Sequence, residues 1–314
     1  MRRYVLRRVA TLVATLVFVS VLVFVVIRVL PGDPALIIMG TEGSPAAVAR
    51  LREALGLDRP LAVQYADWLG RALAGDLGVS IQYDVPVGRL ILSRLPLTLP
   101  LMAMAAALMV LTALPLGLYA ATHHRRAGDY AAMAISQLGI AVPSFWAGLL
   151  LILLFSVHLG WAQSGGFEGW SRGVWPGVRS LLLPALALGF FQAAVLVRAT
   201  RSSVLDVLRE DYVRTARAKG VSEAAVLGRH ALRNALIPVV TVAGIQLGQL
   251  MAGSIILESV FALPGLGRLA LGAITARDLP VVQGVTLFVA SCIVVINFAV
   301  DLVYGLLDPR IRYE

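Results

Sequence analysis

The sequence predicts an all-α integral membrane protein with six transmembrane helices. Its 314 residues are 59% hydrophobic and 14% charged, and the mean hydropathy is +0.83. Soluble domains are about half apolar and about a quarter charged, so this composition favours a membrane protein. Six apolar runs are long enough to cross a bilayer at about 1.5 Å per residue, and basic residues gather at the ends of these runs.

The six runs divide the chain into three parts. Residues 1–30 form the N-terminus and first span, residues 31–95 an extracytoplasmic segment, and residues 96–314 a five-span core with a cytoplasmic loop at 198–235. Prolines inside or beside the runs mark kinks or span ends. The predicted spans are residues 9–30, 96–121, 131–157, 181–199, 236–261 and 283–307.

The arginines predict the orientation of the spans. Four arginines precede the first span, two follow the second and two lie in the tail. The loop at 198–235 holds seven more, together with the only lysine, Lys219. Basic residues favour short cytoplasmic loops, so both termini and this loop are predicted to be cytoplasmic.

The two ends of the first span need separate treatment. The basic N-terminus and the apolar run after it resemble a signal peptide, but the run is long enough to span and no A-x-A-type site follows. We therefore expect an uncleaved first span that ends at "LPGDP". In the outer segment, "SPAAVARLREALGL" predicts a short amphipathic helix. This segment is either a lid over the outer mouth or a docking surface.

Polar residues are few within the predicted spans. Because a polar group facing lipid is costly, they are expected to face the bundle interior or a cavity. Interhelical hydrogen bonding and a translocation path both explain them. Asp301 is expected to pair with an arginine near the cytoplasmic end of the last span. The candidates for the path are Gln137, Gln192, Gln246 and Gln249.

Motifs of catalysis are missing from the sequence. It contains no H-E-x-x-H, no G-x-S-x-G and no G-K-[ST], and its four histidines are scattered. We therefore predict no catalytic residue, no metal site and no cofactor. The net charge of +9 follows the ends of the spans, which favours a lipid environment over nucleic acid. The single Cys292 excludes an internal disulfide.

The cytoplasmic loop has the pattern of two helices around a glycine. "SSVLDVLREDYVRTARAK" predicts one helix that stops at Gly220 in the left-handed conformation. Ser222 is a candidate cap for a second helix, and Glu223 suits its first turn. A solvated loop that obeys the charge rule explains the arginines. The small residues of "TARAKG" favour close packing against another surface instead.

Six motifs in order resemble one known family. The chain is similar over nearly its whole length to the first permease subunit of the ABC importers for dipeptides, oligopeptides, nickel and glutathione. The loop's E-A-A-x-x-x-G pattern falls on Arg214, Thr215, Ala216 and Gly220, with an arginine in place of the acid. The motifs are "LPGDP", "GDLGVS", "AVPSFWAGLLL", "YVRTARAKG" followed by "RHALRNALIP", "FALPGLGRL" and "DLVYGLLDPRIRY".

The resemblance implies the function of a transport subunit in the bacterial inner membrane. The loop would be a coupling helix that enters a cleft of a cytoplasmic ATPase subunit. The implied partners are a second homologous permease, two ATPase subunits and an extracytoplasmic substrate-binding protein. The implied cargo is a di- or oligopeptide or a similar small solute, such as glutathione or a nickel chelate. The implied coupling residues are Arg214, Thr215, Ala216, Arg217, Ala218, Lys219 and Gly220.

Two other classes of protein are weighed against this interpretation. An ion-coupled secondary transporter would need carboxylates near the bilayer midplane and internal repeats. A membrane scaffold protein would not need polar residues inside the spans. Copurification of an ATPase separates the importer from both.

Overall fold

The chain folds into helices throughout the part that the structure describes. A computed structural model describes residues 2–29, 44–54 and 56–307. These residues contain helices and one isolated antiparallel bridge, between Val79 and Pro86, but no strand. The all-α prediction is therefore confirmed. The "LPGDP" motif and the tail from residue 308 lie outside the described residues.

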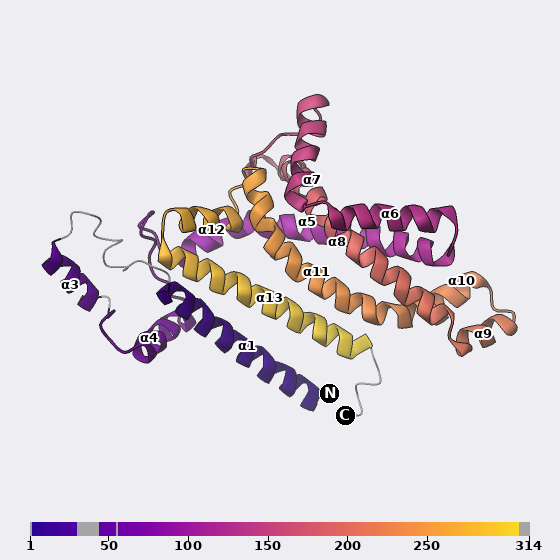
Figure 1. Ribbon diagram of the computed structural model, residues 1–314, viewed down its shortest axis with the longest axis horizontal. Coiled ribbons are helices and arrows are strands. Elements are labelled where there is room, and N and C mark those ends of the chain that lie inside the picture. The colour runs from indigo at the N-terminus through magenta and orange to yellow at the C-terminus, as the bar shows by residue number, and fades with distance from the viewer. Residues whose placement is uncertain (1, 30–43, 55, 308–314) are drawn as a thin grey trace. The chain divides into compact units, whose positions relative to one another are not determined.

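Figure 1 shows the described helices along the chain. Their bounds are α1 Arg2–Val29, α3 Pro45–Ala54, α4 Leu61–Leu73, α5 Val87–Thr122, α6 Ala127–Ala141, α7 Ser144–Leu151, η2 Ile152–His158, η3 Trp170–Arg172, α8 Val174–Leu208, α9 Asp211–Ala218, α10 Glu223–Ala225, η4 Val226–Ala231, α11 Leu232–Val260, α12 Leu266–Thr275 and α13 Leu279–Leu307.

Among the described residues, five helices are long and apolar enough to cross a membrane, and they overlap five of the six predicted spans. The third predicted span, 131–157, is not one straight helix. It is a pair, α6 followed by α7 and η2, bent by 103°. The break lies at Val142 and Pro143, both in an extended conformation. Proline disfavours the helical conformation of the residue before it, which explains the position of the break. With the bent pair counted as one span, the described residues contain six segments long and apolar enough to cross a membrane.

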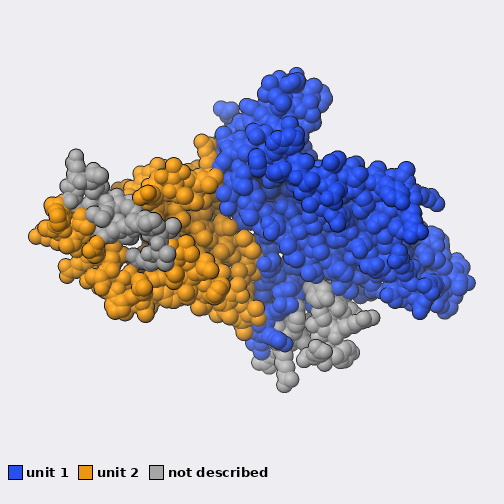
Figure 2. Space-filling view, viewed as in Figure 1, with its two compact units in different colours: residues 1–8, 97–264, 295–314 blue, residues 9–96, 265–294 orange. Residues whose placement is uncertain are grey.

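The chain divides into two compact units (Figure 2), which are described separately. Unit 1 contains residues 1–8, 97–264 and 295–314, and unit 2 contains residues 9–96 and 265–294. The loop at 198–235 belongs to unit 1. The described part of the extracytoplasmic segment belongs to unit 2 as far as residue 95.

Unit 1 is organised around α8. Small residues let α5 approach it closely: a Cβ on Gly117 would lie 2.6 Å from Thr200 Cβ, and one on Gly189 would lie 2.7 Å from the carbonyl oxygen of Ala105. Membrane helices associate through such small-residue contacts. The apolar cluster that fills the space between α5, α8 and α11 contains Met109, Ala113, Ala193, Leu196, Val197 and Val239.

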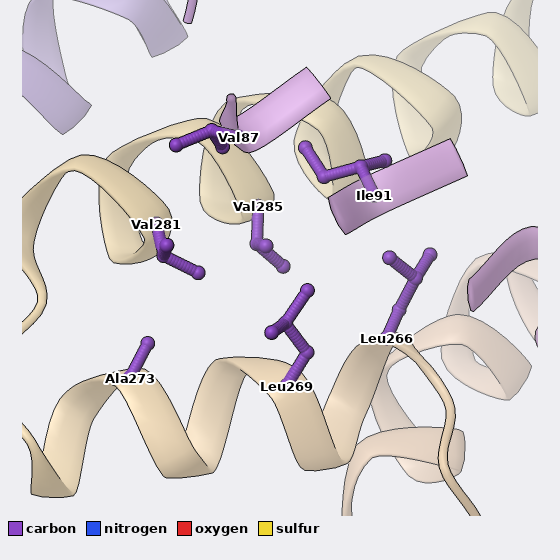
Figure 3. Close-up of a cluster of buried hydrophobic side chains, with 7 residues drawn as sticks. All are labelled: Val87, Ile91, Leu266, Leu269, Ala273, Val281 and Val285. Atoms are coloured by element: carbon purple, nitrogen blue, oxygen red, sulfur yellow. The ribbon is translucent and has the colours of Figure 1, made fainter. Parts of the chain in front are cut away.

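The core of unit 2 lies between the first turns of α5, the helix α12 and the first turns of α13. Figure 3 shows that side chains from all three elements point toward one another. Its buried members are Val87, Ile91, Leu266, Leu269, Ala273, Val281 and Val285. A Cβ on Gly284 would lie 2.6 Å from Val87 Cγ1, so α13 and α5 are closely packed here.

A buried carboxylate holds the turn that leads into α5. Asp278 is 1% exposed and accepts hydrogen bonds from the Ser80 hydroxyl and from the backbone N–H groups of Ile81 and Gln82, the last two at 3.2 Å. The Ser80 hydroxyl oxygen in turn accepts a hydrogen bond from the backbone N–H of Tyr83 at 3.0 Å. The "GDLGVS" motif thus ends in a turn whose conformation is held by hydrogen bonds to the Asp278 carboxylate.

We expect Asp278→Ala to destabilise unit 2. The change leaves buried donors of the turn without an acceptor, and the loss of charge-assisted hydrogen bonds costs about 3 kcal/mol. The apparent melting temperature of the purified protein in detergent should fall, and a protease should cut within the turn. Asp76→Ala is the matched control, because Asp76 is exposed and accepts a hydrogen bond from the backbone N–H of Gly78. Equal melting of the two variants would contradict the assignment.

Candidate functional site

The loop at 198–235 contains one more break than the sequence predicts. The predicted single helix up to residue 219 is wrong, because α8 ends at Leu208 and α9 begins at Asp211. Between them Glu210 has an extended conformation, with φ −66° and ψ 146°. No glycine or proline marks this break in the sequence. The acidic Asp211 in the first turn of α9 favours a new helix start, through the helix dipole.

Gly220 ends α9 as predicted. Its φ is +78°, in the left-handed region that glycine adopts at little cost. The backbone N–H of Gly220 donates to Arg217 O at 2.9 Å, and that of Val221 donates to Ala216 O at 3.2 Å. These two bonds form a Schellman motif, and the apolar contact that accompanies it joins Val221 to the cluster containing Ala216.

A second short helix follows the glycine. Ser222 occupies the cap position of α10 as predicted, although its side chain makes no capping hydrogen bond. Glu223 lies in the first turn and binds Arg217 through two bonds, at 2.8 and 3.2 Å. This bidentate pair closes the turn between α9 and α10. A π-helical turn, η4, then leads into α11.

The loop has a small core of its own. Val213 and Val226 are fully buried and Ala216 is 7% exposed, and they pack with Val207 and Leu208 from the end of α8. On the other side of α9, the Tyr212 hydroxyl accepts a hydrogen bond from Asn234 Nδ2 at 2.8 Å. Because α9 is fastened to both α8 and α11, the loop is a folded element of unit 1.

The predicted coupling residues divide into three groups. Ala216 faces the core of the loop, although the sequence analysis placed it among the residues that meet a partner. Gly220 shapes the turn. The residues whose side chains are exposed are Arg214, Thr215, Arg217, Ala218 and Lys219.

The four glutamines predicted for the path have different surroundings. Gln246 is 7% exposed, whereas Gln249, one turn further along α11, is exposed. Gln137 is exposed and accepts a hydrogen bond from Arg198 Nη1 at 3.3 Å, which links α6 to α8. Gln192 is half-buried on α8. Their role in a path stays a prediction.

We expect thiol chemistry to separate these positions. In a Cys292→Ser background, Gln137→Cys and Gln249→Cys should react with a charged, water-soluble thiol reagent, and Gln246→Cys should react slowly because it is buried. Phe18→Cys, on the apolar surface of α1, is the inert control; Phe18 is 66% exposed. If all three cysteines are as inert as Phe18→Cys, the glutamines serve interhelical packing and line no path.

Sequence reasoning missed the buried acid Glu258 and correctly predicted the pairing of Asp301, which is partly exposed. Glu258 is fully buried near the end of α11 and accepts a hydrogen bond from the Thr98 hydroxyl at 2.7 Å. Glu258 lies inside the predicted fifth span. An acidic residue within a span is expected to face the protein interior, and this was the only signal in the sequence that could have identified it. The pairing predicted for Asp301 is confirmed, because Arg8 Nη1 lies 3.0 Å from its Oδ2.

Four contacts join segments that are distant in the sequence. Each joins two segments that the arginine distribution places on the same side of the membrane. Among segments predicted to be cytoplasmic, Arg8 meets Asp301 and Arg201 meets Asp129. Among segments predicted to be extracytoplasmic, Asp278 meets Ser80 and the Gly166 N–H donates to Phe261 O.

The fold and the folded loop define a multi-pass helical membrane protein of the transport class. Residues 113–313 match the family described as the binding-protein-dependent transport system inner membrane component, and residues 1–102 match the N-terminal membrane component of such systems. The chain therefore belongs to the family of binding-protein-dependent transport system permeases.

Individual relatives agree with this assignment. A protein named as a peptide transport system permease in Brucella abortus (strain 2308) is 45% identical over 314 residues, the whole of both chains. The glutathione transport system permease protein GsiC of Salmonella typhimurium (strain LT2) is 44% identical, also over the whole of both chains. Among solved structures, the MetNI methionine ABC transporter in an inward-facing conformation gives a TM-score of 0.57 at 20% identity. That match covers 70% of this chain and 96% of the other, which shows the fold.

These matches confirm the resemblance drawn from the motifs. The chain is a permease subunit of an ABC importer, a membrane component that works with other subunits, and it is a transport component and not an enzyme. They support this assignment over an ion-coupled secondary transporter or a membrane scaffold protein.

Proposed function

We propose that the chain forms part of the translocation path for di- or oligopeptides, or for a similar small solute such as glutathione or a nickel chelate. The names of its full-length relatives support this class of cargo. The complete importer would contain a second homologous permease, two cytoplasmic ATPase subunits and an extracytoplasmic binding protein. Both termini and the loop at 198–235 would be cytoplasmic, and residues 31–95 extracytoplasmic.

The observation that carries the coupling proposal is the folded loop. A flexible loop would absorb a push from a partner, whereas α9 is fixed to α8 and α11 by a buried cluster and by the hydrogen bond between Tyr212 and Asn234. The exposed side chains of α9 form a surface to which an ATPase subunit would bind. A movement of α9 would therefore carry the ends of two membrane helices with it.

The proposed cycle uses this rigidity. ATP binding draws the two ATPase subunits together, the α9 helices follow as rigid bodies, and the permeases switch between outward and inward access. The ion pair between Arg217 and Glu223 keeps the turn next to Gly220 in place while the movement of the ATPase is transmitted to the membrane helices. The wider family has an acid at the position of Arg214. The arginine would therefore contact a negatively charged surface of the partner.

Reporter fusions test the proposed sidedness. A fusion after residue 75 should report an extracytoplasmic location, and a fusion after residue 225 should report a cytoplasmic one. These two positions lie in the segments that the arginine rule separates most clearly. A cytoplasmic signal at residue 75 or an extracytoplasmic signal at residue 225 would overturn the orientation.

Copurification and uptake together test the proposed function. The tagged chain should bring down a second permease and ATPase subunits from its own membranes. Proteoliposomes of that complex, supplied with the binding protein and ATP, should accumulate a labelled dipeptide or glutathione. Uptake driven by an ion gradient without ATP would favour a secondary transporter. Recovery without any ATPase would favour a scaffold.

A further inference from the structure

A partly buried ion pair in unit 1 joins the turn between α5 and α6 to α8, a contact that the sequence did not predict. Asp129, in the first turn of α6, is 2% exposed. Arg201, in the last third of α8, donates from Nε to Oδ1 at 2.5 Å and from Nη2 to Oδ2 at 2.8 Å. A bidentate arginine–carboxylate pair fixes both distance and orientation.

The turn between α5 and α6 closes around the same carboxylate. The backbone N–H of Arg125 donates to Asp129 Oδ2 at 3.0 Å, and Arg125 has a φ of +63°. A side-chain-bearing residue in this left-handed region needs such support. The Asp129 carboxylate therefore shapes its own turn and binds α8 at the same time.

His124 completes the cluster from one side. Its Nδ1 lies 3.2 Å from Asp129 Oδ2 and 3.0 Å from Arg201 Nη2. One ring nitrogen cannot donate to the carboxylate and accept from the guanidinium at once, so either tautomer makes one of these two bonds. The guanidinium and the carboxylate keep their bidentate contact in both cases.

This ion pair lies on a continuous route to α9. On the C-terminal side of Arg201, α8 continues without a break to Leu208. Leu208 packs in the core of the cytoplasmic loop. Val204 packs with Ala121 of α5 and Ala235 of α11 in a further buried cluster. These apolar contacts hold the helices together without a preferred direction, and the bidentate ion pair adds a fixed geometry between α6 and α8.

We propose that Asp129 and Arg201 are positioning residues for transport, because their ion pair makes the α5–α6 turn move as one body with the end of α8 and with α9. This inference rests on the proposed coupling function. A push on α9 would then reach α6, and through it the bent pair α6–α7, as well as the helices to which the loop is covalently joined. Without the ion pair, α8 would move and the turn would lag behind it.

Coupling efficiency tests the inference in the complete importer. Arg201→Met removes the ion pair and keeps a long side chain, and we expect uptake per ATP hydrolysed to fall about tenfold, as typical coupling energies allow. Basal ATP hydrolysis and the amount of chain in the membrane should stay at the parental level. Arg126→Met is the matched control, because it removes an exposed charge from the same turn, and its ratio should stay parental.

A distance measurement tests the one-body movement directly. Spin labels at Ala127→Cys and Ser202→Cys, both exposed, report the separation of the turn from α8 in a Cys292→Ser background. In the parental complex this distance should be the same without nucleotide and after vanadate trapping. In Arg201→Met it should differ between the two states or broaden.

The outcomes separate this inference from the proposed function. If the parental complex lacks ATPase or does not transport, the proposed function fails. If it transports and Arg201→Met keeps the parental ratio of uptake to hydrolysis, only the positioning role fails. If Arg201→Met does not accumulate, the nearly isosteric Asp129→Asn takes its place with the same expected loss. A parental label distance that changes on trapping also overturns the inference.

Discussion

Gly220→Pro should abolish uptake while the chain still inserts into the membrane. Proline holds φ at about −65°, so it cannot adopt the φ of +78° that Gly220 has at the end of α9. It also removes the N–H that bonds to Arg217 O in the Schellman motif. The turn would be rebuilt and α9 misplaced, although no spanning helix is touched. Uptake and chain abundance measured on the same membranes check this result.

A graded series separates backbone strain from steric contact at Gly220. A Cβ built there meets no atom within 4 Å, so the cost comes from the backbone alone. That cost is about 1–2 kcal/mol for most residues and less for asparagine, which tolerates the left-handed region. Gly220→Asn should transport better than Gly220→Ala. Gly228→Ala, in the same loop with equally open surroundings and no positive φ, should be neutral. Equal activity of all four variants would remove the turn from the mechanism.

Ala216→Arg should also abolish uptake, but through the fold of the loop. Ala216 is 7% exposed and packs with Val213 and Val226. An arginine would overpack this cluster, which destabilises the fold by about 1–3 kcal/mol, and would bring a charge into it. We expect α9 to detach from α8, which limited proteolysis between residues 208 and 226 would reveal. Unchanged proteolysis together with parental uptake would contradict the packing assigned to Ala216.

Ala218→Arg is the companion to that variant. Ala218 is exposed on the same helix, so the loop should remain folded and resistant to protease. If the exposed surface of α9 binds the ATPase, this bulky residue should weaken ATPase copurification. Resistance to protease with full ATPase recovery would place the binding surface on another side of α9.

Strong local signals were enough to predict much of the fold. The apolar runs gave the spans because a membrane helix needs about 20 apolar residues. Gly220 and Ser222 gave the ends of two short helices because their roles in caps are local. A kink or span end at Pro143 was predicted, but a bend as sharp as 103° was not, since proline is also tolerated inside a kinked helix. The break before α9 was not predicted either, because residues 209 and 210 are ordinary helix formers.

The site was predictable only where partners are close in sequence or share a motif. The coupling loop carries its own glycine and caps, so its outline was visible. The pairing of Asp301 was predicted because the arginines at the N-terminus and the acid lie on the same expected side. The bond between Asp129 and Arg201 spans 72 positions and requires α6 and α8 to be adjacent. The sequence alone could not place Ala216 inside the loop, because small residues suit a buried cluster and a docking surface equally well.

Cross-linking from α9 tests the central claim most directly. Thr215→Cys in a Cys292→Ser background places a unique thiol on the exposed surface of α9, where a maleimide-benzophenone reagent can be attached. After illumination of transport-competent membranes, we predict an adduct between this chain and a cytoplasmic ATPase subunit. The same reagent at Ala127→Cys, on the α5–α6 turn, should give little of that adduct. A complex that transports normally but forms no ATPase adduct from Thr215→Cys, Ala218→Cys or Arg214→Cys would contradict the assignment of α9 as the coupling helix.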